Sequence, residues 1–466
     1  MKPTPGRKTS SPADGMSRRP HKCLVIAAGR GSRLASGGLP KPLFPLLGLP
    51  LIERTIVTAK RAGLEEFTVV TGYEGDRITQ FLDRLAVRRG ITISHVVNEK
   101  WDGGNGLSVL AAREAIGQEP FLLLMSDHVV DASLLSGLLD ESIEAGGVCL
   151  AVDRNLRNPL VDLEDVTKVR ASDGRLEAIG KDLERYDAFD TGCFLCSPAL
   201  FSALDQARER EGDESLSAGV ALLAEQGKVR VHDIGDAFWI DVDDASAAER
   251  AELALIAALP KLGDGPVSRH LNRPLSIRIT RHLIDRSITP NQISFFSFVL
   301  CLLAAGLFAV GGALWLAVGG LLAQTASVVD GCDGEVARLR LEESEFGGWF
   351  DAVLDRYADA FLLFGLTWHV FFAAAGSPLA LFTGFMAITG SFLLSYTADK
   401  YDGLMETRFQ QGETRSIRIG RDLRILVIAL GAVLNLPFLA LSLIAVVMNA
   451  ETVRRIVTAS RSRAEA

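Results

Sequence analysis

Four aspartates stand in two pairs within a stretch whose flanks look like membrane helices. Asp330 and Asp333 are three residues apart, and Asp351 and Asp355 are four apart. At these spacings two helices would each present one pair along a single face, so the four carboxylates can converge. An ionised carboxylate at mid-membrane depth costs roughly 2.5–3.5 kcal/mol. Because Mg²⁺ prefers several oxygen ligands, the pattern predicts two divalent ions that together bind a pyrophosphate.

The residues around these aspartates suit the same chemistry. Gly334 and Gly347 would let backbone or ligand approach closely, and Ala337 keeps the same helix face open. Arg338 can reach phosphate oxygens in bidentate fashion. Acid pairs inside spans also form proton relays and cation pathways, so an ion-coupled or proton-coupled transporter is an alternative. A transporter, however, does not require the glycine, alanine and arginine at fixed offsets.

A second stretch suited to phosphate chemistry lies near the start of the chain. CLVIAAGRGSRL is a short apolar strand and a turn, in which Gly29 and Gly31 permit a bend whose backbone amides can cradle phosphate. FLLLMSDHVV is a buried strand that ends in Asp127, a natural metal ligand at the carboxyl end of a parallel sheet. These patterns predict a second, separate phosphate and metal site.

The elements that position these residues differ between the two halves of the chain. A length of 466 residues exceeds what one core normally holds. Polar, mixed sequence runs to about Leu259, and long apolar runs begin near Ile293. We expect a Rossmann-like α/β domain with a mostly parallel sheet, followed by an all-α domain of six transmembrane helices. The expected spans are residues 293–310, 314–329, 350–375, 379–397, 424–434 and 437–449.

Charge in the connections predicts the orientation of the membrane domain. Several basic residues lie between Asp399 and Arg424, and the tail reads RRIVTASRSR, so the positive-inside rule places both on the cytoplasmic side. An even number of spans then puts both termini in the cytoplasm, in a cell inner (plasma) membrane. The expected parts are a disordered tail (1–20), a cytosolic domain (21–259), a juxtamembrane amphipathic segment (260–291), a transmembrane domain (292–456) and a basic cytosolic tail (457–466).

The juxtamembrane sequence SRHLNRPLSIRITRHLIDRSITPNQIS mixes basic residues with Leu and Ile at near-helical spacing. This pattern predicts a helix in the plane of the interface, with Pro290 ending it and starting the descent. An amphipathic linker packed on protein is the alternative. The six cysteines show no zinc spacing, which indicates buried thiols in a reducing compartment. No basic stripe with interleaved aromatics indicates nucleic-acid binding.

The aspartate stretch resembles the signature of the CDP-alcohol phosphotransferases, at eight positions with that family's spacings. The resemblance covers roughly residues 291–455 and implies six transmembrane helices, a homodimer and two divalent ions. It implies that the second aspartate of the second pair also deprotonates the acceptor hydroxyl, whose attack on the β-phosphorus releases CMP. The metal ligands would be Asp330, Asp333, Asp351 and Asp355, with Gly334, Ala337 and Arg338 contacting the CDP moiety.

The first domain resembles the sugar-phosphate nucleotidyltransferases. LPKPLFPLLGLPLIERTI follows the Gly-rich turn, and the resemblance implies that Arg33 and Lys41 hold the triphosphate and the attacking phosphate. It implies one or two Mg²⁺ (or Mn²⁺) ions, with Asp241 joining Asp127 as ligand and Asp243 as the competing choice. A decayed domain kept as a scaffold is the alternative. The residues that match the family's base site are Asn98, Asn105 and Gly106, and the residue that matches its sugar-phosphate site is Lys181.

Both halves together resemble a family of bifunctional enzymes in which a CTP:inositol-1-phosphate cytidylyltransferase is fused to a di-myo-inositol phosphate phosphate synthase. GNGLSVLAA, IGKDLERYDAFDTGCF, WIDVD, SRHLNRPLSIRIT, DGCDGEVAR and SYTADKY carry this resemblance. It implies that CTP and inositol-1-phosphate give CDP-inositol and pyrophosphate. CDP-inositol and a second inositol-1-phosphate then give a phosphorylated di-inositol phosphodiester, an osmolyte precursor.

The acceptor of the second step carries a phosphate, so its site needs positive charge beyond the metals. Lys400, Arg421 and Arg424 stand at cytoplasmic ends of expected spans and are candidates, with positive-inside anchoring as the alternative role. The identity of the alcohol stays open at this point. Another alcohol phosphate, or a lipid acceptor as in phospholipid synthesis, fits the same motifs.

Overall fold

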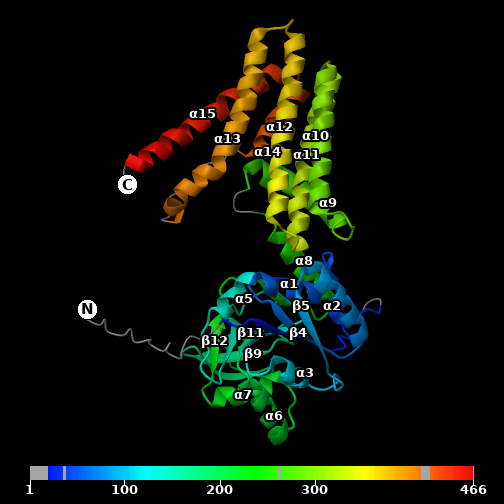
Figure 1. Cartoon of the computed structure of the whole chain (residues 1–466), viewed down its shortest axis with the longest axis vertical. Coiled ribbons are helices and arrows are strands. Elements are labelled where there is room, and N and C mark those ends of the chain that lie inside the picture. Colours follow the sequence, from blue (N-terminus) through cyan, green and yellow to red (C-terminus); the bar gives the residue numbers. More distant parts are fainter. Residues whose placement is uncertain (1–18, 35–37, 261–263, 411–419, 465–466) are drawn as a thin grey trace, which may run out of the picture. The chain divides into compact units, whose positions relative to one another are not determined.

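The computed structural model describes residues 19–34, 38–260, 264–410 and 420–464; within these ranges the side chains of residues 399–410, 459 and 461–464 lie outside the description. Most of the tail expected to be disordered (1–20) is therefore outside the described residues. The chain forms two compact units, Met1–Ala254 and Leu255–Ala466, which are labelled by element in Figure 1.

The first unit is built on a large sheet flanked by helices. In the described residues this sheet has nine strands in the order β5-β4-β1-β6-β11-β8-β12-β10-β9. Its strands are β1 (Lys22–Ala27), β4 (Glu66–Thr71), β5 (Thr92–Val97), β6 (Phe121–Met125), β8 (Val148–Asp153), β9 (Lys168–Ser172), β10 (Arg175–Gly180), β11 (Ala188–Cys196) and β12 (Val229–Asp233). Its helices are α1 (Leu51–Arg61), α2 (Gly75–Arg89), α3 (Asn105–Ala111), α4 (Arg113–Ile116), α5 (Ala132–Leu139), α6 (Ala199–Glu211), α7 (Leu216–Glu225) and α8 (Ala245–Ala257).

The predicted α/β class with a mostly parallel sheet is confirmed: of the nine strands in the described residues, only β10 and β11 run against the others. β5, β4, β1 and β6 are parallel neighbours, whereas β11 runs antiparallel to both β6 and β8. β11 follows the antiparallel pair β9 and β10 and returns through the middle of the sheet. Two short pairs complete the unit: β2 (Pro45–Leu46) with β3 (Leu49–Pro50), and β7 (His128–Val130) with β13 (Trp239–Asp241).

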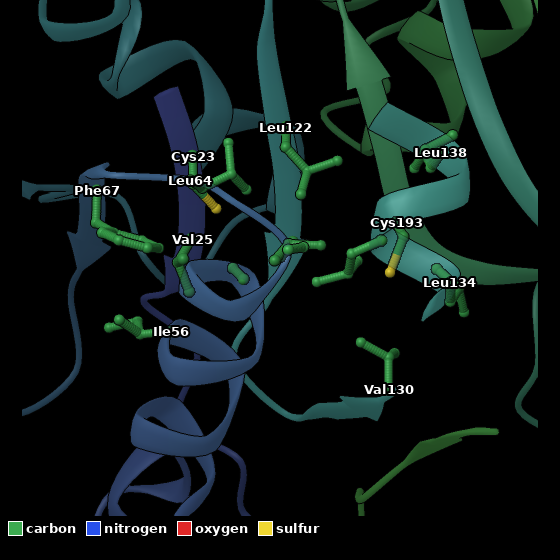
Figure 2. Packing of buried hydrophobic residues seen from close by; sticks show 14 of the residues in the cluster. Cys23, Val25, Ile56, Leu64, Phe67, Leu122, Val130, Leu134, Leu138 and Cys193 are labelled. Atoms are coloured by element: carbon green, nitrogen blue, oxygen red, sulfur yellow. The ribbon is translucent and has the colours of Figure 1, made fainter. Parts of the chain in front are cut away.

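Both faces of the sheet are buried, which explains the unbroken apolar sequence of its central strands. Along β1, Cys23 and Val25 belong to one hydrophobic cluster, and Leu24 and Ile26 to the cluster on the opposite face. Figure 2 shows Val25 packed beside Ile56 of α1 and Phe67 of β4. All six cysteines of the chain are free and buried, as the sequence predicted. Burial raises the pKa of the Cys149 and Cys193 thiols to about 12.

The second unit is helical. A π-helical turn (Ser268–Asn272) and α9 (Arg273–Leu283) come first. Six longer helices follow in the described residues: α10 (Pro290–Val310), α11 (Ala313–Leu339), α12 (Glu345–Ala373), α13 (Pro378–Gln410), α14 (Arg421–Val433) and α15 (Pro437–Ala464). Among the described residues, four segments are long and apolar enough to cross a membrane: Pro290–Val310, Ala313–Leu339, Pro378–Ala398 and Pro437–Thr458.

The other two expected spans do not meet this criterion of length and composition. α12 carries Asp351, Asp355 and Asp359 in its first half. α14 has 13 residues, about 20 Å of helix against a hydrocarbon core of about 30 Å. The helices themselves are present as expected, so the difference concerns how α12 and α14 meet the bilayer.

The helices that carry the aspartates are longer than the expected spans. α11 continues beyond Val329 to Leu339, and α12 already begins at Glu345. The four aspartates therefore lie on regular helix, as their spacing predicted. Pro290 is the first residue of α10, and the side chain of Thr289 accepts a bond from the Gln292 amide in a capping box. The predicted break before the first span is confirmed.

The juxtamembrane helix α9 is attached to α11 through polar side chains. Glu335 of α11 is completely buried and accepts bonds from Arg273 Nη1 (2.8 Å), Ser276 Oγ (2.5 Å) and Thr280 Oγ1 (2.6 Å). These three donors follow one face of α9, while Leu275 is 41% exposed. In the second unit α9 thus packs on protein, as the alternative interpretation of this segment predicted, and presents apolar side chains elsewhere.

Candidate active sites

The first candidate site lies between α11 and α12. Asp330, Asp351 and Asp355 each bring one oxygen within 4.8 Å of the others, a spacing that could hold a metal ion. Serines of α10 hold the first pair: Ser297 Oγ donates to Asp330 (2.9 Å) and Ser294 Oγ donates to Asp333 (2.5 Å). Asp333 lies beside Asp351, outside the group of three. The structure thus brings the four predicted ligands together, with three of them converging most closely.

Arg421 reaches into this aspartate cluster from the start of α14. Its Nη1 lies 2.7 Å from Asp330 Oδ2 and 2.8 Å from Asp355 Oδ1, and its Nε donates to Asp359 (3.2 Å). The side chain of Arg421 is only 13% exposed. One guanidinium therefore joins carboxylates from both helices, a position that charge in the connecting segment could not predict.

Arg424 and Asp359 form a buried pair behind Arg421. Arg424 Nη2 lies 3.2 Å from Asp359, and its Nη1 donates to the Ser391 carbonyl (3.1 Å) and to Ser395 Oγ (3.3 Å). Both residues are about 95% buried, which fits a supporting role of Asp359 in the cluster and excludes a solvated surface position for it. Arg424, expected to bind acceptor phosphate, points instead into this internal network. The side chain of Lys400 lies outside the described residues.

The side chain of Arg338 is suited to bind an anion. Its buried Nε and Nη2 have no hydrogen-bond partner among the described residues. A Cβ on Gly334 would lie 3.2 Å from Arg338 Nη1, so the glycine keeps this guanidinium unobstructed. Ala337, on the same helix, is buried. A buried guanidinium is costly without an acceptor, which makes a phosphate group a fitting partner.

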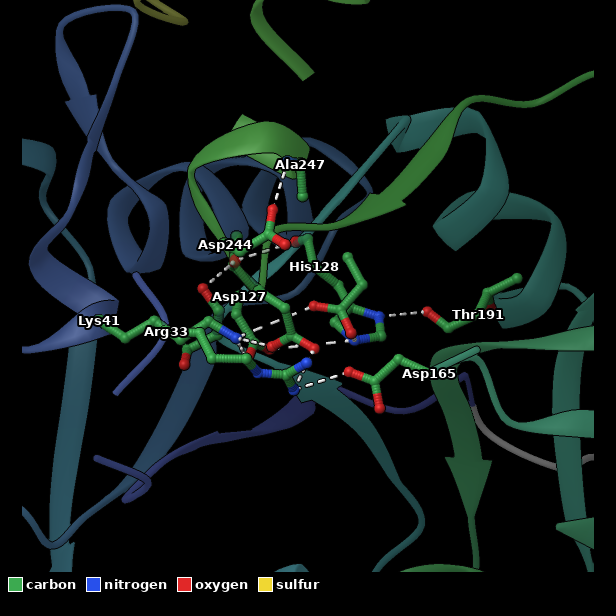
Figure 3. A network of polar contacts seen from close by, with 12 residues as sticks. Arg33, Lys41, Asp127, His128, Asp165, Thr191, Asp244 and Ala247 are labelled. Atoms are coloured by element: carbon green, nitrogen blue, oxygen red, sulfur yellow. Dashed lines mark hydrogen bonds and ion pairs between the residues drawn. The ribbon is translucent and has the colours of Figure 1, made fainter. Parts of the chain in front are cut away.

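The second candidate site is a cavity of about 400 Å³ at the carboxyl ends of β1 and β6 in the first unit. Figure 3 shows its polar network, in which basic side chains meet a group of carboxylates. Residues from the Gly-rich turn, both strand ends and the β13 segment surround it. The predicted site residues that line it are Gly29, Gly31, Arg33, Lys41, Asn105, Asp127, Lys181 and Asp241.

Lys41 is the centre of this network. Its Nζ lies 2.5 Å from Asp127 Oδ2 and 3.9 Å from Asp241 Oδ1, and it bonds directly to Asp243. Burial alone would lower the pKa of Lys41, but the three carboxylates raise it above its ordinary value. Gly31 has a φ of +58°, and a Cβ there would lie 2.3 Å from Lys41 Cβ. The turn therefore needs glycine both for its backbone conformation and to admit the lysine.

His128 is a site residue that the sequence interpretation missed. It stands opposite Asp241 in the β7–β13 pair, and Asp127, His128 and Asp241 bring ligand atoms within 4.8 Å of one another. Burial lowers the pKa of His128, but the carboxylates of Asp241 and Asp127 outweigh that effect and raise it to about 10. The signal was in SDHVV, where histidine directly follows the aspartate predicted to bind a metal ion. Asp243, the alternative to Asp241, instead bonds to Lys41 and Arg33.

Arg33 and Lys181 share one acidic partner. Arg33 Nη2 lies 2.7 Å from Asp165 Oδ2, a contact that Figure 3 shows. Lys181 Nζ lies 2.5 Å from Asp165 Oδ1. The ammonium of Lys181, followed by the guanidinium of Arg33, holds the pKa of Asp165 well below its usual range. Asp165 was not predicted, because a lone acid in a loop belongs to no motif. Two cations that reach one carboxylate can also reach one phosphate.

The residues expected at the base site have different surroundings. Asn105 starts α3, lines the cavity and accepts a bond from the Leu216 amide (2.8 Å). Asn98 does not line the cavity: it is 5% exposed and bonds Ser108 Oγ and the Lys100 amide. A Cβ on Gly106 would lie 2.6 Å from the Glu214 carbonyl. Asn98 and Gly106 therefore shape the loop that presents Asn105, rather than line the cavity themselves.

The two units match two families of transferases. A model of the MobA-like NTP transferase domain matches residues 23–226, and a model of CDP-alcohol phosphatidyltransferase matches residues 287–457. The chain is therefore an enzyme with a nucleotidyltransferase domain and a CDP-alcohol phosphotransferase domain. Its apolar helices make it a membrane protein.

The chain belongs to the family of bifunctional IPC transferases and DIPP synthases. It is 41% identical to the Rubrobacter xylanophilus protein of that name over 446 residues, 94% of this chain and 96% of the relative. The Thermococcus kodakarensis protein of the same name is 34% identical over 386 residues, 82% and 83% of the two chains. Among solved structures, the inositol-1-phosphate CTP transferase from T. maritima is 26% identical, with a TM-score of 0.45, and the match covers 50% of this chain and 93% of that one.

Proposed function

We propose that the chain catalyses two consecutive reactions, CTP-dependent activation of inositol-1-phosphate and transfer of the activated inositol phosphate to a second inositol-1-phosphate. The observation that carries this proposal is the presence of two separate clusters of acids and bases, one in each unit. The names of the relatives that match nearly the whole chain support the inositol phosphate and CTP substrates. The final product would be di-myo-inositol phosphate phosphate, which becomes an osmolyte after dephosphorylation.

In the first reaction a phosphate oxygen of inositol-1-phosphate attacks the α-phosphorus of CTP. A bond from this oxygen to phosphorus forms, the bond to the β-phosphate breaks, and pyrophosphate leaves. Lys41 and Arg33 bind the triphosphate and the attacking phosphate, and Lys181 binds the sugar phosphate. The shared contact of Arg33 and Lys181 with Asp165 supports this assignment, because both cations reach the same anion. Their fixed charges stabilise the negative charge that develops in the transition state.

In the second reaction a hydroxyl of the acceptor attacks the β-phosphorus of CDP-inositol. Asp355 accepts the hydroxyl proton, the pyrophosphate bond breaks, and CMP leaves. Arg338 binds the donor phosphates, which would supply the acceptors that its buried nitrogens lack. Arg421, already held between both aspartate-bearing helices, lies where it can bind the acceptor phosphate. Asp359 fixes the orientation of Arg421 through Nε.

The acidic clusters fit divalent ions. Buried oxygens of Asp351 and Asp241 have no hydrogen-bond partner among the described residues, as expected of atoms suited to a cation. We assign two Mg²⁺ or Mn²⁺ ions to Asp330, Asp333, Asp351 and Asp355, and one or two to Asp127 and Asp241. Such ions would neutralise the carboxylates and polarise phosphoryl oxygens.

The proposal also assigns each part of the chain to the cytosol or to the membrane. Residues 21–259 form the cytosolic nucleotidyltransferase domain, 260–291 the juxtamembrane segment, and 292–456 the transmembrane domain of a multi-pass inner (plasma) membrane protein. Both termini, including the basic tail 457–466, are cytoplasmic. Exposed aromatic residues along α12, among them Phe361, Phe364, Trp368 and Phe372, suit contact with lipid or with a second copy in a homodimer.

The proposal is tested by mass spectrometry of the products formed by purified protein. CTP, Mg²⁺ and a panel of alcohol phosphates are supplied, with and without phospholipid acceptors. We expect CDP-inositol first and the phosphorylated di-inositol phosphodiester second, with inositol-1-phosphate alone among the polyol phosphates. If another alcohol phosphate were converted instead, the proposed substrate would be wrong. A labelled lipid product would show that the acceptor of the second reaction is a lipid rather than soluble inositol-1-phosphate.

Replacing Arg421 with alanine is expected to raise the KM for inositol-1-phosphate in the second reaction by about tenfold or more, with a smaller change for CDP-inositol. A hydrogen bond to a charged group contributes roughly 1.5–3 kcal/mol, which corresponds to this change in affinity. Initial rates with each substrate varied in turn measure the effect. The neighbouring Arg424→Ala serves as control: its buried network predicts lower thermal stability without selectivity for the acceptor. Equal KM changes for both substrates in Arg421→Ala would reduce its role to anchoring helices.

A further inference from the structure

We infer that His128 is a third protein ligand of the divalent ion in the nucleotidyltransferase domain, so that this ion is held by two carboxylate oxygens and one imidazole nitrogen. This inference rests on the metal-dependent cytidylyl transfer proposed above, and it concerns the ion that Asp127 and Asp241 would hold.

Each of the two acids directs one oxygen to Lys41 and the other to His128. Asp127 places Oδ2 at 2.5 Å from Lys41 Nζ, and its Oδ1 lies 4.0 Å from His128 Nε2. Asp241 places Oδ1 at 3.9 Å from Lys41 Nζ, and its Oδ2 lies 3.4 Å from His128 Nε2. Adjacent ligands of an octahedral ion with bonds of about 2.1 Å are about 3 Å apart, and opposite ligands about 4.2 Å. Nε2 is thus spaced from both oxygens as a ligand would be.

The imidazole is oriented through its other nitrogen. Nδ1 of His128 lies 2.7 Å from the Thr191 carbonyl oxygen, which can only accept a hydrogen bond. Nδ1 therefore carries a hydrogen, and an ion that displaces the proton of Nε2 would meet the lone pair of the nitrogen that faces the carboxylates. Metal-binding histidines commonly donate their second N–H to a carbonyl or carboxylate in this way.

Gly192 provides the space for this orientation. Its φ is +73°, and a Cβ at this position would lie 2.4 Å from His128 Nδ1. Any other residue would push the ring away from the Thr191 carbonyl. On its other side the ring lies 6.4 Å, centroid to centroid, from the buried indole of Trp239. The ring is thus fixed by β11, β7 and β13, and its free nitrogen points at the two acids.

An imidazole ligand changes which ions suit the site. Mg²⁺ prefers oxygen ligands, whereas imidazole also suits transition metals. The nucleotidyltransferase site should therefore favour Mn²⁺ over Mg²⁺ more strongly than the all-carboxylate cluster of Asp330, Asp351 and Asp355. A histidine that only forms an ion pair with Asp241 would produce no such difference between the two sites.

The test is electron spin-echo spectroscopy of Mn²⁺ bound to the full-length protein in detergent, without nucleotide. We expect ¹⁴N modulation from a directly bound imidazole, and its replacement by ¹⁵N modulation when histidine alone is labelled with ¹⁵N. His128→Gln should abolish this signal and weaken Mn²⁺ binding to this site. Loss of a residue that only hydrogen-bonds to a metal ligand typically weakens metal binding about 10–100-fold, so loss of the ligand itself should cost at least as much. Gly192→Ala, which displaces the ring but keeps both acids, should weaken the signal as well.

His232→Gln is the matched control, because His232 is also partly buried and bonded to a carboxylate, Glu141 (3.0 Å), but does not belong to the acidic cluster. Its variant should retain the nitrogen modulation. Absence of modulation in the unaltered protein with Mn²⁺ bound, or its persistence in His128→Gln, would overturn the inference. These readouts do not depend on turnover, so failure to form CDP-inositol would count against the proposed function and leave the ligand assignment standing.

Discussion

Replacing Asp355 with asparagine is expected to reduce CDP-dependent transfer by about 10²–10⁴-fold, so that CDP-inositol accumulates and the final phosphodiester disappears. Asparagine keeps the size of the side chain but cannot take a proton from the acceptor hydroxyl. It also removes one of the three carboxylates that contact the Arg421 guanidinium. Mass spectrometry of the reaction with CTP and inositol-1-phosphate measures both species at once.

Asp330→Asn is the comparison that separates a base from a ligand. It removes charge from the same cluster, so it should weaken metal and donor binding and respond to raised Mg²⁺. If high Mg²⁺ restored turnover in Asp355→Asn as well, the assignment of Asp355 as base would fail. If neither change affected transfer, the intramembrane acids would instead belong to an ion pathway, as in the transporter alternative.

Replacing Asp127 with asparagine is expected to abolish CTP-dependent pyrophosphate release while the second unit still consumes supplied CDP-inositol. Asp127 contacts Lys41 and lies with His128 and Asp241 in a group that could hold a metal ion. Loss of a proposed metal contribution of several kcal/mol corresponds to about a thousandfold in rate. Pyrophosphate release and CMP release are measured separately on the same preparation.

The control for this variant is Asp83→Asn, which changes an aspartate that is 65% exposed and paired with His95 outside the cavity. It should leave both activities near their original values. Loss of both reactions in Asp127→Asn, in a protein that keeps its thermal stability, would argue against two independent sites.

The helical spacing of the four aspartates could be predicted from the sequence because α11 and α12 are regular helices through that region. The surroundings of the cluster could not, since they depend on contacts between distant segments. Arg421 lies 91 residues from Asp330 in the chain, and no local pattern places its guanidinium between two carboxylates. The sequence interpretation therefore named Arg421 as a phosphate ligand without foreseeing its contacts with the acids.

In the nucleotidyltransferase site, too, local motifs could be predicted from the sequence, whereas contacts between distant segments could not. The strand before Asp127 and the Gly-rich turn have local signatures, so Gly31, Lys41 and Asp127 were found. His128 depends on the pairing of β7 with β13, and Asp165 on a loop that crosses the cavity. The reversed direction of β11 within the mostly parallel sheet could not be predicted either, because it is set by tertiary pairing rather than by the apolar sequence of the strand.

The burial of all six cysteines has a practical consequence. Four of them (Cys23, Cys149, Cys193 and Cys196) are in the first unit, and Cys301 and Cys332 are in the second. A buried thiol must become accessible and ionised before it reacts with an alkylating reagent. Peptide-resolved alkylation kinetics would therefore follow the opening of each unit separately, with native residues as the probes. The same protein sample could then show whether a substitution at one site loosens only its own unit.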